Sequence, residues 1–130
     1  MTQSIETGSN RPMKIVIVDD DALVLRVHAE MLRSMGYVPF TFESPEDALG
    51  YLSGYREHVC MVISDYRMPE MNGLEFIEKL RCFDSHTPAT IITGFASEVD
   101  IKTAEEWNVK VINKPIRIQT LKEHVQSALS

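Results

Sequence analysis

A short run of β-branched apolar residues at 15–18 is followed directly by three consecutive aspartates, Asp19, Asp20 and Asp21. An uninterrupted apolar run of this length is typical of a strand buried on both faces, and such strands occur in parallel sheets covered by helices. Because open α/β sheets bind ligands at the carboxyl ends of their strands, these acids follow a strand where such folds carry out chemistry. Clustered carboxylates repel one another, so we expect a divalent cation among them, and oxygen ligands favour Mg²⁺.

Similar apolar segments recur along the chain, and each is followed by a segment with helical periodicity or helix-start signals. We predict strands at 13–18, 37–42, 59–63, 89–92 and 110–113, and helices between the acids and Gly36, at 45–54, 74–82 and 97–107, and from Ile118 onward. This alternation implies a flavodoxin-like, doubly wound (βα)5 fold, with a parallel sheet in the order 2-1-3-4-5 and helices on both faces. Pro39 indicates that the second strand lies at an edge.

The length of 130 residues fits one domain, which we place at 13–130 after a polar tail at 1–12 that we expect to be disordered. A formal net charge of −6 argues against a nucleic-acid-binding surface, which needs clustered Lys and Arg. No apolar run approaches the length of a membrane span, and no signal-peptide pattern precedes the first strand.

The cysteines and histidines carry no metal-site pattern. Cys60 and Cys82 form no Cys-x-x-Cys motif, and we interpret them as reduced thiols of a cytoplasmic protein. The histidines are scattered without metal-ligand spacing, so we assign surface or packing roles to His28, His58, His86 and His124.

Polar residues also end the later strands. Asp65 ends the third strand, Thr93 the fourth and Lys114 the fifth. In the predicted strand order these positions meet Asp19 and Asp20 at one edge of the sheet. A carboxylate can attack phosphorus, and a metal ion with a lysine can neutralise the transferred phosphoryl group. The set therefore indicates a minimal phosphoryl-accepting site, whereas Asp21 is better explained as a helix cap.

Four segments closely resemble the receiver domain of two-component response regulators, of the chemotaxis-regulator type. They are IVIVDDDALV (15–24), MVISDYRMPEMNGLEFI (61–77), IITG (91–94) and NKP (113–115). The resemblance implies that Asp65 is the phosphoacceptor and that Mg²⁺ is held by Asp65, by Asp20 directly, by Asp19 through water and by the backbone carbonyl of Arg67. It also implies that Thr93 is the switch hydroxyl, that Lys114 pairs with the phosphoryl group and that the bond before Pro115 is cis.

The resemblance implies a signalling module rather than an enzyme with turnover, since receivers only catalyse their own phosphorylation and dephosphorylation. The phosphodonor would be a phosphohistidine on a sensor histidine kinase or on a histidine phosphotransfer protein of a phosphorelay. The output face would comprise the fourth helix, fifth strand and fifth helix, with Val99, Ile101, Trp107 and Val111. This face would contact an output domain or protein, or a second copy in a homodimer.

The chain departs from the family pattern at several positions. Val111 replaces the usual Tyr or Phe, so we hypothesise that switching depends on Thr93 and on backbone shifts of the loop that follows it. Arg67 and Phe95 occupy positions that tune the phosphoryl lifetime in the family. Arg67 could screen attacking water or pair with an acid, and Arg67→Ala is expected to change the dephosphorylation rate.

Two alternatives come from other functional classes. A haloacid-dehalogenase-like phosphatase would use Asp19 as its nucleophile in an Asp-x-Asp pattern with Asp21, with Lys114 as its lysine. That assignment leaves no role for Asp65, and the chain lacks the later acidic pair. A receiver-like docking module that takes no phosphate is the other alternative, and the intact set of site residues argues against it.

Overall fold

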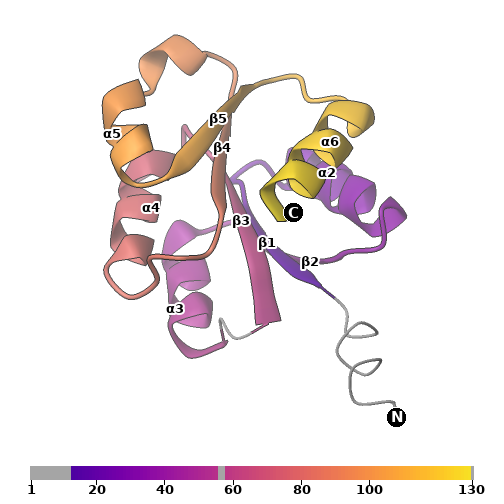
Figure 1. Ribbon diagram of the computed structural model, residues 1–130, viewed down its shortest axis with the longest axis horizontal. Helices are drawn as coiled ribbons and strands as arrows, with labels where there is room; N and C mark the ends of the chain where they lie inside the picture. Colours follow the sequence, from indigo (N-terminus) through magenta and orange to yellow (C-terminus); the bar gives the residue numbers. More distant parts are fainter. Residues whose placement is uncertain (1–12, 56–57, 130) are drawn as a thin grey trace.

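Five parallel strands form one sheet in the order β2-β1-β3-β4-β5 in this computed structural model, which describes residues 13–55 and 58–129 (Figure 1). The strands are β1 (Lys14–Val18), β2 (Val38–Phe42), β3 (Val59–Asp65), β4 (Ala89–Thr93) and β5 (Val109–Asn113). The predicted strand order is confirmed, and so is the edge position of β2, which contains Pro39. The tail predicted at 1–12 lies outside the described residues.

Helices cover both faces of the sheet, as predicted. On one face lie α2 (Ala22–Ser34) and α6 (Ile118–Leu129), and on the other α3 (Pro45–Tyr55), α4 (Gly73–Arg81) and α5 (Ile101–Glu106) (Figure 1). Within the described residues, no helix combines the length and apolar character that crossing a membrane would require.

The uninterrupted apolar strands supply two cores because successive side chains point to opposite faces of a sheet. Val16, Val18 and Val62 pack with residues of α3, α4 and α5. Their neighbours Ile15 and Ile17 pack with residues of α2 and α6 on the other face. Both faces of β1 are therefore buried, which explains why this strand shows no polar alternation.

Local signals fix the ends of the first helices. The Asp21 side chain accepts hydrogen bonds from the backbone N–H groups of Leu23 and Val24, so it caps α2 as predicted. Gly36 follows the helix with φ of +94°, a conformation that costs glycine little and other residues more. The Ser44 hydroxyl accepts a hydrogen bond from the Asp47 N–H at the start of α3.

The helix predicted at 97–107 is wrong in its first half. The chain forms a short 3-10 turn, η2 (Ala96–Glu98), becomes extended at Val99, and begins α5 only at Ile101. Val99 is extended (φ −83°, ψ 130°) and buried in the core, so its side chain anchors the break. The Asp100 side chain then accepts a hydrogen bond from the Thr103 N–H and caps a new helix.

Candidate functional site

Three carboxylates meet at the carboxyl ends of β1 and β3. Asp19 and Asp20 follow β1, Asp65 ends β3, and the two strands pair directly with Val18 opposite Ser64. One oxygen from each acid lies within 4.8 Å of the others, a spacing that could hold one metal ion. Carboxylate oxygens suit Mg²⁺, and the exposed Asp20 leaves an open side where water could complete the coordination. The donor set therefore fits the predicted cation.

Lys114 reaches the same cluster from the end of β5. Its Nζ lies 3.1 Å from Oδ1 of Asp65 and 3.6 Å from Oδ2 of Asp19. Partial burial lowers the pKa of Lys114, but the hydrogen bond to Asp65 and the attraction of both carboxylates outweigh it, so the net pKa is raised. Lys114 thus carries a positive charge beside Asp65, and the bond from Lys114 to Pro115 is cis, as the resemblance implies.

The pKa of Asp19 is strongly perturbed. Its side chain is buried, with the residue 2% exposed, and burial raises its pKa to about 6. A hydrogen bond from the Asp21 N–H, at 2.9 Å, opposes that shift, while the nearby charge of Asp65 adds to it. A bound divalent cation would relieve both the burial cost and the repulsion, so the perturbation itself supports a metal site.

We expect Mg²⁺ binding to weaken below pH 6, because the metal must displace the proton that Asp19 then carries. For one displaced proton, the Mg²⁺ dissociation constant should rise by about tenfold per pH unit. Isothermal titration calorimetry at a series of pH values measures this slope, and Asp19→Asn should flatten it. An affinity that stays constant from pH 7 to about pH 5 would contradict the prediction.

Thr93 ends β4 beside this cluster in the sheet and is buried. Its Oγ1 accepts a hydrogen bond from the Phe95 N–H at 3.2 Å, and its carbonyl accepts one from the Lys114 N–H at 2.7 Å. The hydroxyl is therefore tied to the loop that follows β4. A switch hydroxyl that turned toward a phosphoryl group would have to release this loop.

Gly73, at the start of α4, brings the loop after Asp65 back onto the strand end. Its N–H donates to the carbonyl of Tyr66 at 2.7 Å. A Cβ atom added at Gly73 would lie 2.4 Å from the Asp65 carbonyl oxygen, a distance that real side chains do not adopt. Glycine is therefore required here because the two backbone segments approach closely. Gly73 lies within the segment 61–77 that resembles the receiver family, but the sequence alone did not indicate this role.

The Arg67 side chain leans toward the loop that follows β4. Its guanidinium donates to both carboxylate oxygens of Glu98, with Nε 3.0 Å from each, and its Cζ lies 5.3 Å from the centre of the Phe95 ring. Of the two roles considered for Arg67, the structure shows pairing with an acid. Sequence reasoning missed Glu98, because the two partners are 31 residues apart and no spacing rule connects them.

The four residues predicted for the output face do not all lie on the surface. Ile101 is exposed, and Trp107 and Val111 are partly buried. The prediction that Val99 lies on the surface of this face is wrong, since Val99 is only 3% exposed and packs in the core on the side of α3, α4 and α5. In this conformation it supports the face from beneath instead of forming part of its surface.

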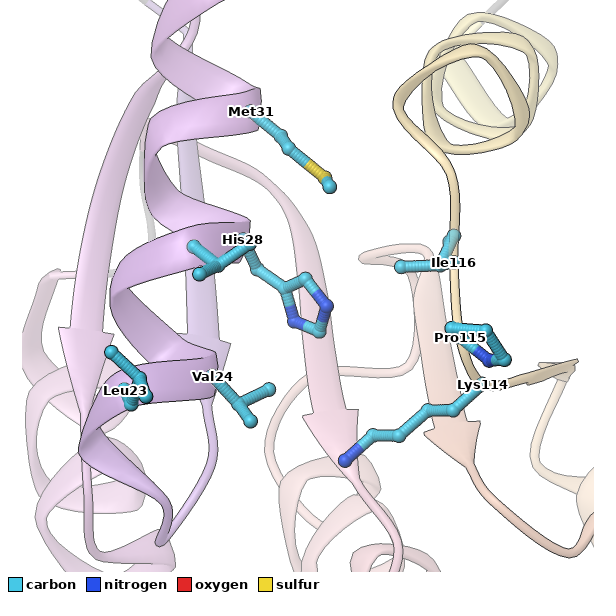
Figure 2. A pocket seen from close by; sticks show the side chains of 8 residues that line it. Leu23, Val24, His28, Met31, Lys114, Pro115 and Ile116 are labelled. Atoms are coloured by element: carbon cyan, nitrogen blue, oxygen red, sulfur yellow. The ribbon is translucent and has the colours of Figure 1, made fainter.

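An apolar groove runs between α2 and the segment after β5, beside Lys114. Its inner part, about 340 Å³, is lined mainly by apolar side chains, and Figure 2 shows the His28 imidazole pointing from α2 toward Pro115 and Ile116. Burial lowers the pKa of His28, and the positive charge of Lys114 lowers it further, so the imidazole is neutral at pH 7. The packing role assigned to His28 agrees with its burial.

The groove continues along α2 into a second part of about 400 Å³. Val27 and Met31 line both parts, and Ile118 at the start of α6 lines the outer one. Leu23 is 69% exposed and Val27 is 46% exposed, so α2 presents apolar side chains to solvent along this groove.

Comparison with known proteins identifies relatives that match this chain over most of its length. A family model described as the response regulator receiver domain matches residues 15–126. The chain is 33% identical over 122 residues to the transcriptional regulatory protein GlrR of Escherichia coli (strain K12), covering 93% of this chain and 27% of that protein. It is 31% identical over 121 residues to a chemotaxis protein CheY homolog of Campylobacter jejuni (strain 81-176), covering 90% of this chain and 92% of that protein.

A solved structure extends the likeness at the level of the fold. The CheX-CheY-BeF3-Mg+2 complex from Borrelia burgdorferi contains a chain that superposes with a TM-score of 0.88. The sequences are 21% identical, and the match covers 95% of this chain and 94% of that one. The chain thus spans nearly all of two small relatives but about a quarter of the length of GlrR.

Proposed function

Because this chain belongs to the response regulator receiver domain family, we propose that it accepts a phosphoryl group on Asp65 from a phosphohistidine. The observation that carries the proposal is the meeting of Asp19, Asp20 and Asp65 within 4.8 Å, with the Lys114 ammonium 3.1 Å from Asp65. The donor would be a sensor histidine kinase or a histidine phosphotransfer protein. The product, an aspartyl phosphate, would act as a signal and not as a step in substrate turnover.

The residues at the strand ends suit an in-line displacement at phosphorus. A carboxylate oxygen of Asp65 attacks the phosphorus atom, the new P–O bond forms, and the P–N bond to the donor imidazole breaks. Lys114 stabilises the negative charge of the transferred group, and Thr93 donates its hydroxyl hydrogen once the Phe95 N–H is released. Mg²⁺, when held by the three acids and the Arg67 carbonyl, would supply most of the charge neutralisation.

The phosphatase alternative is disfavoured by the same geometry. Its second acid would be Asp21, but that carboxylate accepts hydrogen bonds from the N–H groups of Leu23 and Val24 and serves as the helix cap. Its nucleophile would be Asp19, which is buried and therefore poorly placed to reach an incoming phosphate ester.

The direct test is phosphorylation by acetyl phosphate with intact-mass spectrometry as the measurement. We expect one added phosphoryl group in the presence of Mg²⁺ and none after chelation with EDTA, since the acids cannot gather around a phosphoryl anion without a cation. Mg²⁺ binding without any adduct would instead support a docking module that takes no phosphate.

A phosphohistidine donor must approach Asp65 closely, so we place its docking surface on the groove beside Lys114. The groove is apolar, and it exposes Leu23 and Val27 on α2 and Ile118 on α6. Desolvation of such side chains is a common source of binding energy in protein interfaces.

Val27→Asp should slow transfer from a phosphorylated histidine phosphotransfer domain by about tenfold or more, because a charge would be buried in an apolar contact. Phosphorylation by acetyl phosphate should be unchanged, since the small donor needs no docking surface. Ile101→Asp is the matched control, as it places the same charge on an exposed apolar residue of α5. Equal slowing by both variants, or slowing with acetyl phosphate, would contradict the assignment.

For the output we propose the face built from α5, β5 and α6, through which a downstream domain or protein, or a second copy, would sense phosphorylation. The exposed Ile101 and the partly buried Trp107 and Val111 support this choice. With Val111 in place of an aromatic residue, coupling to this face would rest on the loop between β4 and α5, which Thr93 contacts through the Phe95 N–H.

A further inference from the structure

An ion pair joins the loop after the phosphoacceptor to the loop after the switch threonine. Arg67 lies two residues beyond Asp65, and Glu98 lies in η2, five residues beyond Thr93. The guanidinium binds both carboxylate oxygens of Glu98 and lies over the ring of Phe95. The two loops that flank the site are therefore connected through one cation.

The contact has the geometry of a preferred partner rather than a chance surface pair. Two-point binding of a carboxylate uses the planar fork of the guanidinium, and the aromatic ring adds a favourable face for the same cation. The guanidinium is charged at every physiological pH, and hydrogen bonding to Glu98 raises the pKa of Arg67 further. However, the pair is exposed to water, where ion pairs are weak and exchange partners readily.

We propose that Glu98 is a positioning residue that holds Arg67 while Asp65 is unphosphorylated, and that the phosphoryl group then takes Arg67 from it. This inference rests on the proposed function, because the competing anion is the aspartyl phosphate. A phosphoryl group carries nearly two negative charges and three acceptor oxygens, whereas Glu98 offers one charge and two oxygens. Mg²⁺ and Lys114 would neutralise part of this charge, and the acceptor oxygens that they leave open attract Arg67, which lies two residues beyond Asp65 in the chain.

When Arg67 leaves Glu98, the short segment around Glu98 loses one contact, while its two ends remain anchored. On one side of Glu98 the Ala96 N–H donates to Oδ1 of Asn113 at 3.0 Å, and on the other Val99 is buried in the core. Release of Glu98 thus acts on the short stretch between these anchors, at the break that precedes α5. In a chain with Val111 at the usual aromatic position, this exchange gives the phosphoryl group a second way to act on the loop before the output face, by removing the contact of Arg67 with Glu98.

The test is a double-mutant cycle on binding of beryllofluoride, a stable phosphoryl analogue, in the presence of Mg²⁺, followed by 19F NMR. Glu98→Gln should lower the dissociation constant by about twofold to fivefold, the range set by an exposed ion pair, because Arg67 no longer has a competing partner. Arg67→Ala should raise the dissociation constant while leaving the backbone carbonyl in place. In the Arg67→Ala background, Glu98→Gln should have no effect.

A second measurement follows Arg67 directly. The 15N–1H resonance of its Nε–H group, assigned by its absence in Arg67→Ala, should shift when beryllofluoride binds, and Glu98→Gln should shift it before any ligand is added. Glu106→Gln on α5 is the matched control, since it removes the same charge from an exposed residue and should leave both readouts unchanged.

The outcomes separate this inference from the proposed function. Equal tightening by Glu98→Gln with and without Arg67, or by Glu106→Gln, would mean that only the overall charge matters and would overturn the exchange. An Arg67 resonance that does not respond to bound beryllofluoride would overturn it as well. Absence of both beryllofluoride binding and phosphorylation in the unmodified chain would instead overturn the proposed function.

Discussion

Asp65→Asn is expected to abolish the phosphoryl adduct that acetyl phosphate and Mg²⁺ produce on the unmodified chain. The amide has no anionic oxygen to attack phosphorus, and the substitution also removes one charge from the metal cluster and from the ion pair with Lys114. Because no second carboxylate in the cluster combines exposure to the donor with a neighbouring ammonium at 3.1 Å, we expect no residual adduct by intact-mass spectrometry.

Asp21→Asn is the matched control for this experiment. It makes the same chemical change two residues from Asp19, but asparagine caps a helix about as well as aspartate does, so folding and phosphorylation should both persist. An adduct that survives Asp65→Asn would show that another residue is the acceptor. Label on Asp19 with continuous phosphate release would restore the phosphatase alternative.

Gly73→Ala is expected to destabilise the fold by about 2–3 kcal/mol, the cost of forcing an atom into a site that cannot expand. The added Cβ would lie 2.4 Å from the Asp65 carbonyl oxygen and 3.1 Å from Tyr66 Cα, and both are backbone atoms that no rotamer change can move. Because relief requires a shift of the strand end that carries Asp65, phosphorylation should slow as well. Urea unfolding monitored by circular dichroism measures the loss of stability.

Gly50→Ala provides the control in the same protein. Gly50 lies within α3, and a Cβ atom there would meet nothing within 4 Å. Alanine should therefore stabilise the protein by about 0.5–1 kcal/mol through better helix propensity. If both substitutions changed the free energy of unfolding equally, the close approach at Gly73 would not be the cause.

The fold could be predicted from the chain because its signals are local and agree with one another. The apolar run at 15–18 is buried on both faces, Pro39 lies in the edge strand, and Asp21, Ser44 and Gly36 mark helix ends where expected. The prediction of one continuous helix at 97–107 failed because burial holds Val99 in an extended conformation. This is a tertiary effect that helical periodicity does not report.

Strand topology also made the candidate site predictable, since parallel strands bring their carboxyl ends to one edge. Asp19, Asp20, Asp65 and Lys114 meet there in the structure as the strand order required. The pairing of Arg67 with Glu98 was not predictable, because it depends on the path of two loops across that edge.

The sequence by itself determined the alternation of strands and helices, the helix caps and the identity of the acids at the sheet edge, because spacing and residue type are enough to specify each of them. The strand order was expected because it is the usual arrangement of five such units. Only the tertiary structure decided the environment of those residues. The pKa of Asp19 near 6, the close approach at Gly73 and the ion pair between Arg67 and Glu98 all depend on distances between groups far apart in the chain. Such distances are set when the loops pack, and burial and charge then act through them.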